Sequence, residues 1–234
     1  MNLFQISEEK FLEGQMLLIE KPIGWSSFDV VKKIKYLIRK RYNLKKIKVG
    51  HAGTLDPLAS GLLIICTGKF TKKISEIQDK RKIYTGIITL GGTTPSFDLE
   101  TEIEKNYKTD HISEDLIKKT TTKFLGEINQ VPPIFSALKK DGERLYEKAR
   151  RGEKIKINSR KVTIYKFESK LLHKVNVHFK IECSKGTYIR SIANDLGAAL
   201  NCGGYLSKLC RTDIGEFSLS NAMSINSFED HINT

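Results

Sequence analysis

The segment from Gly50 to Leu63, GHAGTLDPLASGLL, contains the carboxylate with the strongest case for chemistry. Its three glycines, Asp-Pro step and small residues describe a tight loop that leads into a buried strand. Asp56 lies on this loop near His51, and it is the only acidic residue between positions 30 and 75. A carboxylate on a constrained loop can act as a nucleophile or as a general base. An Asp before Pro also commonly initiates a turn, and the residues alone favour that structural interpretation.

A second informative segment, CSKGTYIRSIANDLGAAL, runs from Cys183 to Leu200. A strand is expected to end at Ser184 and a helix to begin near Tyr188 and Arg190 after a Lys-Gly turn. Two interpretations follow from this placement. The pair is either a core tyrosine and a surface arginine, or a ring and a guanidinium directed into one cleft.

Several common functional sites are excluded by spacing. Gly61–Phe70, GLLIICTGKF, ends in Gly-Lys, but a phosphate-binding P-loop needs about four residues between its glycines and Ser or Thr after Lys. Here six residues intervene and Phe70 takes the hydroxyl position, and a dinucleotide-binding fingerprint is also absent. Among the five histidines only His173 and His178 are close, and on a strand they would face opposite sides. We therefore expect no metal site.

The amino-terminal half predicts the elements that must position Asp56. Met16–Lys21 is expected to form a short buried strand. Ser26 or Ser27 could cap the helix that follows, and Asp29 is placed to complete a capping box from Ser26. Leu62–Cys66 indicates a buried strand, and Tyr84–Leu90 alternates like a strand.

The carboxyl-terminal half continues with a helix that begins at Ser113 and runs toward Phe124. Strands are predicted over Val162–Phe167 and Val175–Cys183, followed by an amphipathic helix over Ile189–Leu200. Strands and helices interleave without a regular βαβ repeat. The pattern predicts an α+β fold with a mixed, largely antiparallel sheet flanked by helices.

The charge balance favours a polyanionic partner. The 234 residues include 40 Lys and Arg against 27 Asp and Glu, a net charge of +13. Lys32–Lys48 has nine basic residues in seventeen and no acid, so a phosphate-binding surface is at least as plausible as a solvated helix face. Lys139–Lys156, with eight basic and four acidic residues, is typical of an ordinary solvated surface.

The chain indicates a cytoplasmic protein. Its start lacks the basic and apolar regions of a signal peptide, and its longest purely apolar run, Leu62–Cys66, is far shorter than the roughly 20 residues of a membrane helix. The four cysteines form no CxxC pair and are expected to be reduced thiols.

Six blocks of the chain, spanning about residues 16–218, together resemble the tRNA pseudouridine-55 synthase family. In chain order the blocks are residues 17–27 (LLIEKPIGWSS), 50–63 (GHAGTLDPLASGLL), 82–91 (KIYTGIITLG), 131–152 (VPPIFSALKKDGERLYEKARRG), 183–197 (CSKGTYIRSIANDLG) and 203–217 (GGYLSKLCRTDIGEF). The resemblance implies a pseudouridine-synthase-like catalytic domain with its active-site cleft across the sheet. It also implies an isomerase that flips uridine 55 of the T loop out of its stack and needs no cofactor.

The resemblance also assigns the site residues. Asp56 takes the position of the catalytic carboxylate, with Arg190 available to pair with it. Tyr84 and Leu209 would stack and pack on the flipped base, and His51 would fill the gap that the base leaves. The implied substrate-binding positions are His51, Tyr84, Tyr188, Arg190 and Leu209. Whether Asp56 attacks C1′, attacks C6 or abstracts the 2′ proton stays open at this point.

The sequence departs from the family pattern at a few positions. Cys210 stands where members usually carry the first Arg of an Arg-Arg pair, and Thr94 replaces a usual acid while Asp98 keeps a second one. We expect one catalytic domain over residues 1–234, with an RNA-grasping insertion at about 131–156 and no separate carboxyl-terminal RNA-binding domain. The expected partner is the T-arm stem-loop of tRNA, bound by a monomer without metal or membrane.

Two other functions stay open on the sequence. A catalytically silent RNA-binding or RNA-folding protein would use the same basic cleft, although such a protein would be expected to lack Asp56 or Tyr84. A guide-RNA-dependent relative that acts on ribosomal RNA would typically carry terminal extensions.

Overall fold

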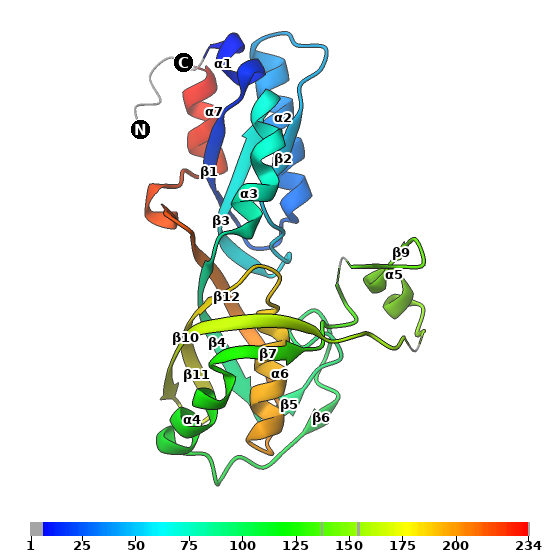
Figure 1. Ribbon diagram of the computed structural model, residues 1–234, viewed down its shortest axis with the longest axis vertical. Helices are drawn as coiled ribbons and strands as arrows, with labels where there is room; N and C mark the ends of the chain where they lie inside the picture. The colour runs from blue at the N-terminus through cyan, green and yellow to red at the C-terminus, as the bar shows by residue number, and fades with distance from the viewer. Residues whose placement is uncertain (1–6, 137, 154, 234) are drawn as a thin grey trace. The chain divides into compact units, whose positions relative to one another are not determined.

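The computed structural model describes residues 7–136, 138–153 and 155–233, and the chain divides into two compact units (Figure 1). Unit 1 comprises Met1–Ile83 and Cys210–Thr234, and unit 2 comprises Tyr84–Leu209. The chain passes into unit 2 along strand β4 (Lys82–Leu90) and returns along β12 (Gly204–Ile214). One catalytic domain over residues 1–234 stays a prediction.

Unit 1 is built on a short sheet between helices. Its elements besides the ends of β4 and β12 are α1 (Glu8–Glu13), β1 (Met16–Lys21), α2 (Ser27–Arg41), β2 (Val49–His51), β3 (Ala59–Thr67), η1 (Gly68–Lys73), α3 (Ile74–Asp79), β13 (Phe217–Ser218), η3 (Leu219–Asn221) and α7 (Ile225–Asn233). Both β1 and β2 pair with β3 in antiparallel register, and residues 210–214 of β12 follow β3 in the sheet.

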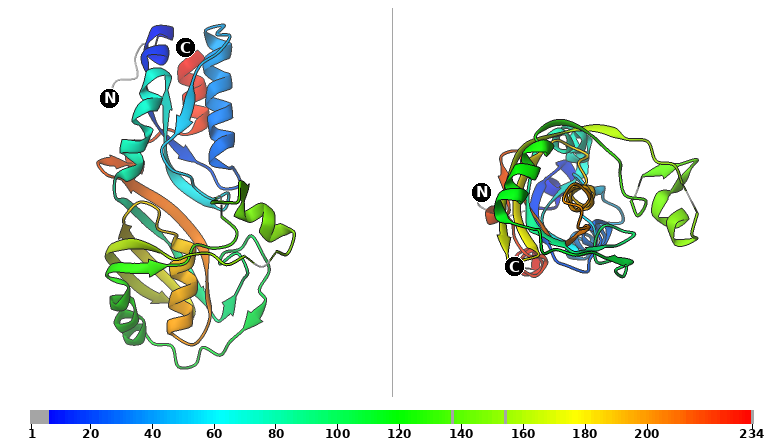
Figure 2. Two further views of the ribbon diagram at one scale, coloured as in Figure 1. Left: turned by 45° about the vertical axis from the view of Figure 1, so that its right-hand side comes forward. Right: turned by 90° about the horizontal axis from the view of Figure 1, so that it is seen from below.

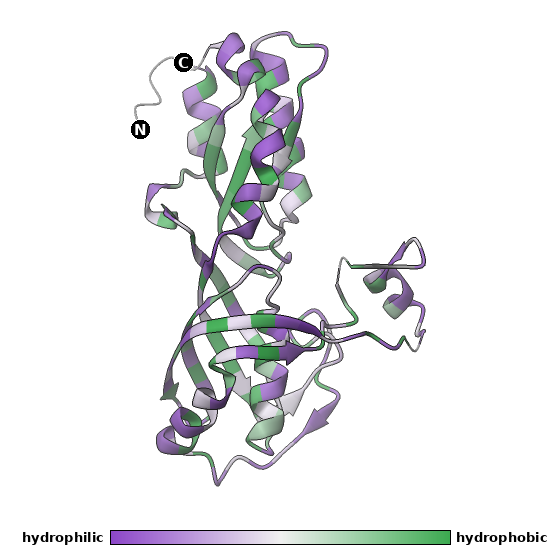
Figure 3. Cartoon of the chain, viewed as in Figure 1, coloured by the Kyte–Doolittle hydropathy of each residue, from purple (hydrophilic) through white to green (hydrophobic). Residues whose placement is uncertain are grey.

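Strand β3 is the centre of unit 1 because nearly all of its side chains are buried. It is hydrophobic along most of its length in Figure 3, as expected for a strand covered on both faces. Helices α2 and α7 lie side by side (Figure 2) and pack with β1 and β3 into one core. Helix α7, which the sequence analysis missed, contributes Ile225, Phe228 and Ile232 at helical spacing.

Unit 2 is a larger, strongly curved sheet with one long helix, α6 (Ile189–Ala199), against it (Figures 1 and 2). Its other elements are β5 (Gly92–Thr93), β6 (Lys105–Asn106), α4 (Glu114–Thr121), η2 (Thr122–Phe124), β7 (Gly126–Gln130), β8 (Lys139–Lys140), β9 (Glu143–Arg144), α5 (Leu145–Arg150), β10 (Arg160–Leu172) and β11 (Asn176–Cys183). The strand order is β12, β4, β11, β10 and β7.

The predicted elements are confirmed, although β3 begins three residues before the predicted Leu62 and β10 continues five residues beyond the predicted Phe167. Strand β1 has the predicted bounds, and β11 buries Val177, Phe179, Ile181 and Cys183 on one face as alternation required. The α4 helix begins after Ser113 but ends at Thr121, where a 3₁₀ turn continues to Phe124. The α+β class with a largely antiparallel sheet flanked by helices is confirmed. Isolated parallel bridges, such as the one between Ile19 and Met223, make the pairing mixed.

No helix within the described ranges is both long enough and apolar enough to cross a membrane. The cysteines at 66, 183, 202 and 210 are free thiols, and the first three are buried.

Helix α2 begins with the predicted capping box. The backbone N–H of Asp29 donates to Ser26 Oγ at 3.1 Å, and the backbone N–H of Ser26 donates to Asp29 Oδ2 at 3.1 Å. Ser26 Oγ also donates to Asp29 Oδ2 at 2.6 Å, and this bond, together with the one from the Ser26 backbone N–H, holds the pKa of the Asp29 carboxyl below its usual value.

We predict that Ser26→Ala lowers the free energy of unfolding by about 1 kcal/mol, because the first turn of α2 loses its side-chain acceptor. Urea denaturation followed by circular dichroism measures the change. Ser75→Ala is the control, since Ser75 is exposed within α3 and caps no helix. Equal losses in the two variants would contradict the capping role.

Candidate active site

The loop of residues 52–58 joins β2 to β3 and carries Asp56, whose side chain is half-buried. The Asp56 carbonyl accepts a hydrogen bond from the backbone N–H of Ala59 at 3.0 Å, which closes a turn directly before β3. The predicted tight loop before a buried strand is therefore confirmed. The side chains around it in unit 1 determine where Asp56 lies.

Arg211 is the first of these side chains and is 1% exposed. Its Nε donates to the carbonyl of Leu62 at 2.9 Å, and Nη2 donates to the carbonyl of Gly53 at 3.0 Å. A longer bond of 3.4 Å joins Nη1 to the carbonyl of Thr54. The planar guanidinium thus ties the loop to the strand that follows it, which a point charge could not do in the same geometry.

Ser27 and Lys21 hold the other side of the loop. Ser27 Oγ accepts from the backbone N–H of Leu55 at 2.8 Å and donates to the Leu55 carbonyl at 3.0 Å. The fully buried Lys21 donates from Nζ to the carbonyls of Trp25 and Pro22 at 2.6 and 2.9 Å. It also reaches the carbonyl of Pro57 at 3.5 Å. Residues on both sides of Asp56 are therefore fixed by buried polar groups.

Gly61 in β3 allows the backbone of Arg211 in β12 to pack directly against it. Its φ is +105°, and a Cβ placed there would lie 2.3 Å from the Arg211 carbonyl oxygen and 2.9 Å from Cys210 Sγ. A side chain would meet both a disfavoured backbone conformation and a collision with the neighbouring strand. The glycine in the sequence SGLL is thus required by the packing of β3 against β12 within unit 1.

The electrostatic environment of this loop is positive. Burial, opposed in part by the attraction of Asp56, lowers the pKa of Lys21 to about 8, so its ammonium group stays largely charged at pH 7. Arg211 lies close enough to disfavour that charge as well. The Asp56 carboxylate is therefore attracted by a buried ammonium group, with a second buried cation nearby.

His51 lies at the end of β2 and is half-buried. Burial, together with the positive charge of Arg211, holds the pKa of its imidazole below the usual value. Its Nδ1 is buried and has no hydrogen-bond partner among the described residues. That His51 fills the gap left by the flipped base stays a prediction.

In unit 2, Tyr188 is the N-cap residue of α6 and is held through its backbone. Gln130 Oε1 accepts from the Tyr188 N–H at 2.8 Å, and Gln130 Nε2 donates to the Tyr188 carbonyl at 3.0 Å. The Arg160 guanidinium lies 4.6 Å from the centre of the Tyr188 ring, a cation–π distance.

Arg190 lies in the first turn of α6 and is 3% exposed, so the surface interpretation of this residue is wrong. Its Nε lies 3.6 Å from Asp98 Oδ2, and Nη1 donates to the carbonyls of Phe135 and Ser96 at 2.9 and 3.4 Å. Asp98 is itself buried and accepts a hydrogen bond from the backbone N–H of Glu100 at 3.0 Å. The arginine is therefore clamped by a carboxylate and two carbonyls of its own unit.

Tyr84 and Leu209 lie at the ends of the unit 2 portions of β4 and β12, which are neighbouring strands. The backbones of these strands are close, because a Cβ at Gly86 would lie 2.1 Å from the Lys208 carbonyl oxygen. Tyr84 is 9% exposed and Leu209 is half-buried. The structure thus places both residues at one end of this strand pair.

Unit 1 therefore contains Asp56 and His51, and unit 2 contains Tyr84, Tyr188, Arg190 and Leu209. That all six line one cleft, and that Arg190 pairs with Asp56, stay predictions.

Sequence reasoning missed Lys21 and Arg211. Both are buried cations that position the Asp56 loop, and both fall inside blocks that the analysis quoted, EKP and CRT. The available signal for Lys21 was its place on the alternating face that Leu17 and Ile19 share. Arg211 carried a weaker signal, since it occurs in a mixed run of polar residues.

The two basic stretches, Lys32–Lys48 and Lys139–Lys156, differ in how many of their cations form ion pairs. In the insertion, Arg151 pairs with Glu143 and Glu153, and Arg150 pairs with Glu100. In Lys32–Lys48 the described ion pairs are Lys32 with Asp29 and Lys33 with Glu229, both of whose acids lie outside the run. Most of that stretch consequently keeps an unneutralised positive charge.

Within the described ranges, no cluster of three or more His, Cys, Asp or Glu side chains has the arrangement of a metal site.

The chain is similar to known proteins over nearly its whole length. The model of the "TruB family pseudouridylate synthase (N terminal domain)" matches residues 39–189. The "tRNA pseudouridine synthase B" of Flavobacterium johnsoniae is 58% identical over 228 residues, which cover 97% of this chain and 100% of that one. The protein of the same name from Phocaeicola vulgatus is 48% identical, with 94% of both chains covered.

Solved structures show a similar fold. A chain in the "Crystal Structure of a Cbf5-Nop10-Gar1 Complex" matches with a TM-score of 0.69 and 27% identity. The match covers 97% of this chain but only 57% of that one. A chain of the "archaeal box H/ACA sRNP Nop10-Cbf5 complex" matches with a TM-score of 0.70 and 25% identity, and 57% of its length is covered.

We predict that Arg211→Lys lowers the free energy of unfolding by roughly 2–4 kcal/mol. An ammonium group cannot replace the fork that joins the Leu62 and Gly53 carbonyls, and each hydrogen bond from a charged donor is worth about 1.5–3 kcal/mol. Urea denaturation measures the loss.

Arg41→Lys, at the exposed end of α2, is the matched control and should be within about 0.5 kcal/mol of the parent protein. An Arg211→Lys variant as stable as this control would show that the guanidinium does not hold the loop.

Proposed function

The chain belongs to the TruB family of pseudouridylate synthases, which are isomerases, and on that basis we propose that it converts uridine 55 in the T loop of tRNA to pseudouridine. The observation that carries the proposal is the placement of Asp56. It lies on a loop held from both sides by buried cations, in a chain 58% identical to a protein named tRNA pseudouridine synthase B.

The reaction breaks the N1–C1′ bond of the nucleotide, turns the uracil and joins C5 to C1′. The proton of C5 is transferred to N1, so substrate and product have the same composition and no oxidant, reductant or group donor is consumed. The target base must first leave its stack, at a cost of a few kcal/mol. The rest of the reaction needs one carboxylate that is ionised and correctly placed.

Asp56 supplies that carboxylate, as nucleophile toward C1′ or C6 or as base toward the 2′ proton. Lys21 and Arg211 serve it from within unit 1. Their hydrogen bonds to the carbonyls of Pro57 and Gly53 hold the loop, and their charges favour an ionised carboxylate. Preorganisation of this kind matters because a displacement of about 1 Å in a reacting group can cost roughly a hundredfold in rate.

The residues of unit 2 are proposed to bind the flipped base. Tyr84 stacks on the flipped uracil and Leu209 packs against it, contacts worth about 1–3 kcal/mol per stacked base. The pairing of Arg190 with Asp56 stays part of the proposal, and Tyr188 is proposed to orient groups near the base or to help remove the C5 proton.

Two other functions have less support. A catalytically silent RNA-binding protein has no need for a carboxylate held this firmly. A guide-dependent enzyme is suggested by the solved relatives, whose titles describe Cbf5 complexes, but their identity of 25–27% is well below the 58% and 48% of the relatives named for tRNA.

We predict that Asp56→Asn abolishes pseudouridine formation on unmodified tRNA while the melting temperature stays within about 2 °C of the parent. The amide has nearly the same shape but can act neither as nucleophile nor as base. Single-turnover reactions with chemical mapping of pseudouridine measure the rate.

Asp110→Asn serves as the control, because Asp110 is an exposed turn residue and should leave the rate unchanged. Product formation by the Asp56→Asn variant at a tenth of the parental rate would contradict the assignment.

We further predict that an isolated T-arm hairpin is modified with a kcat/KM within about tenfold of full-length tRNA, a difference of roughly 1.4 kcal/mol. Specificity should come from the loop shape and from the ease of extruding its uridine, both of which the hairpin retains. A hairpin with cytidine at the target position should give no product. A hairpin several hundredfold poorer than tRNA would instead show that distant contacts dominate recognition.

A further inference from the structure

Two residues of unit 2 that lie outside the six family-like blocks of the sequence contact Tyr188. Arg160 begins β10 and Gln130 ends β7, and the two residues are paired directly across these antiparallel strands, which lie side by side in Figure 1. Side chains of directly opposed residues lie on the same face of a sheet. The strand pairing therefore places both side chains next to the residue at which α6 begins.

Gln130 fixes the backbone of Tyr188. It is 1% exposed, and its amide both accepts from the Tyr188 N–H and donates to the Tyr188 carbonyl. A carboxamide can do this because it carries an acceptor oxygen and a donor nitrogen in one group. With the backbone held, the position of the tyrosine ring depends only on its two side-chain torsions.

Arg160 restricts these two torsions. The Cζ atom of its guanidinium lies 4.6 Å from the centre of the Tyr188 ring, which is a cation–π distance. A Cβ placed at Gly186 would lie 3.5 Å from Cζ and 3.6 Å from each Nη atom of Arg160. The nearly equal distances show that the guanidinium turns its flat face to the Gly186 turn. Planar stacking of this kind is specific to arginine among the cationic side chains.

The turn of residues 184–187 is itself fastened to β10, the strand that carries Arg160. The Ser184 N–H donates to the Thr163 carbonyl at 2.9 Å, and the Thr163 N–H donates to Ser184 Oγ at 2.9 Å. Thr187 Oγ1 donates to the Ser184 carbonyl at 3.0 Å and closes the turn. The guanidinium therefore lies against a fixed surface on one strand end and over the Tyr188 ring.

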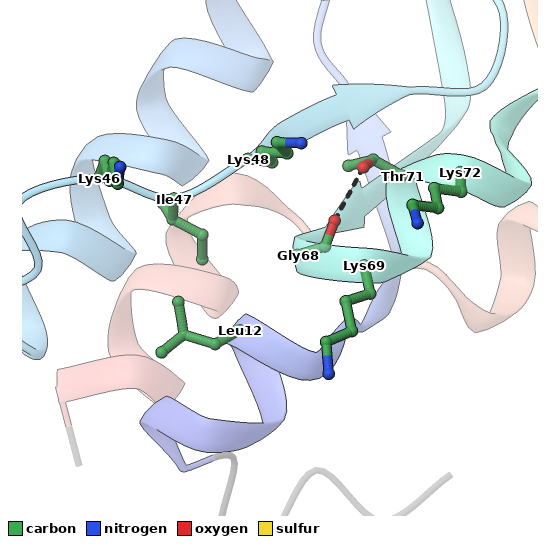
Figure 4. Close-up of a pocket in the computed structure, with 8 residues that line it drawn as sticks. All are labelled: Leu12, Lys46, Ile47, Lys48, Gly68, Lys69, Thr71 and Lys72. Carbon is green, nitrogen blue, oxygen red and sulfur yellow. Dashed lines mark hydrogen bonds between the residues drawn. The ribbon is translucent and has the colours of Figure 1, made fainter.

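The charge of Arg160 is less open to solvent than the charges of the surface lysines. A cavity of about 480 Å³ in unit 1 is lined in part by four exposed lysines, Lys46, Lys48, Lys69 and Lys72 (Figure 4). Arg160 is half-buried, and its Nε is buried without a hydrogen-bond partner among the described residues. An unpaired buried donor costs free energy, and the position of the cation over an aromatic ring offsets part of that cost. This placement favours an action on Tyr188 over an action on a solvent-exposed anion.

We propose that Arg160 is a positioning residue for Tyr188 and completes the hold that Gln130 begins. Gln130 fixes the backbone and Arg160 fixes the ring, so the phenol meets the flipped uracil in one orientation. This inference rests on the proposed function for the role of Tyr188. Because Arg160 acts through the tyrosine, it contributes to the rate of the reaction and not to the affinity for tRNA.

The test measures the Arg160→Gln variant in single-turnover reactions on unmodified tRNA. We expect the rate constant to fall about tenfold, which is less than the roughly hundredfold cost of displacing a reacting group by about 1 Å. The tRNA affinity, measured by fluorescence anisotropy, should stay within about twofold, and its salt slope should change by less than about 0.7, the value for one lost phosphate contact. Arg160→Met, which also removes the charge, should behave in the same way.

Lys161→Gln is the matched control. It removes the same charge at the next position of β10, where the exposed side chain lies on the opposite face of the strand. This variant should keep the parental rate and affinity. An Arg160→Gln variant as fast as this control would overturn the inference. A tRNA affinity that falls in proportion to the rate would overturn it as well, because Arg160 would then contact the RNA itself.

A double-mutant cycle identifies the group through which Arg160 acts. In a Tyr188→Phe background, Arg160→Gln should still slow the reaction about tenfold, because phenylalanine keeps the ring face. In a Tyr188→Leu background the same change should add less than about twofold. A tenfold effect that persists with leucine, or one that disappears with phenylalanine, would contradict an action through the ring.

Melting temperatures of the same proteins test the contact without any activity. Arg160→Gln should lower the melting temperature less in the Tyr188→Leu background than in the parent protein, since the ring that the cation stabilises is already gone. Equal shifts in the two backgrounds would overturn the inference. Pseudouridine formation by the parent tests the proposed function alone, so failure of that function is distinguishable from failure of the Arg160 contact.

Discussion

The buried guanidinium of Arg211 holds the carbonyl groups of the loop that carries Asp56, and the arrangement of unit 1 depends on this contact. An arginine removed from water must have its donors satisfied, and here the backbone oxygens of Leu62, Gly53 and Thr54 accept them. The same bonds satisfy loop carbonyls that a tight turn cannot pair within itself. This packing also requires glycine at position 61, because any side chain there would displace the Arg211 backbone.

Lys21 both holds the Asp56 loop by hydrogen bonds and places a positive charge near its carboxylate. Its ammonium group donates to carbonyls on two segments, before α2 and after Asp56, and burial lowers its pKa to about 8. A cation that stays charged despite burial is stabilised by a nearby anion, and Asp56 is that anion. The carboxylate thus lies in a fixed positive environment that does not need to reorganise when charge shifts during a reaction.

Unit 2 uses a similar arrangement. Arg190 is buried at the start of α6 and is held by Asp98 and by the carbonyls of Phe135 and Ser96. Each unit therefore contains a buried arginine that joins segments distant in sequence.

The sequence by itself determined the local elements and the chemistry of the loop. Capping by Ser26 and Asp29 and the alternation in β11 depend on only a few neighbouring residues. Both could therefore be predicted from the sequence, and both are observed in the structure. The short helix α7 was missed although its apolar spacing is regular. Asp56 was assigned as the candidate carboxylate from the family resemblance, because the residues of its loop alone favoured a turn-initiating Asp.

Only the tertiary structure decided which cations are buried and what they hold. Arg211 and Leu62 are 149 positions apart, and Arg190 and Ser96 are 94 positions apart. No local pattern distinguishes such an arginine from the many basic residues that stay exposed in a chain of net charge +13. Likewise, Lys69 and Lys72 became neighbours of Lys46 and Lys48 because β2 pairs with β3. Burial and charge clustering depend on contacts between distant segments, and those contacts form only when the chain folds.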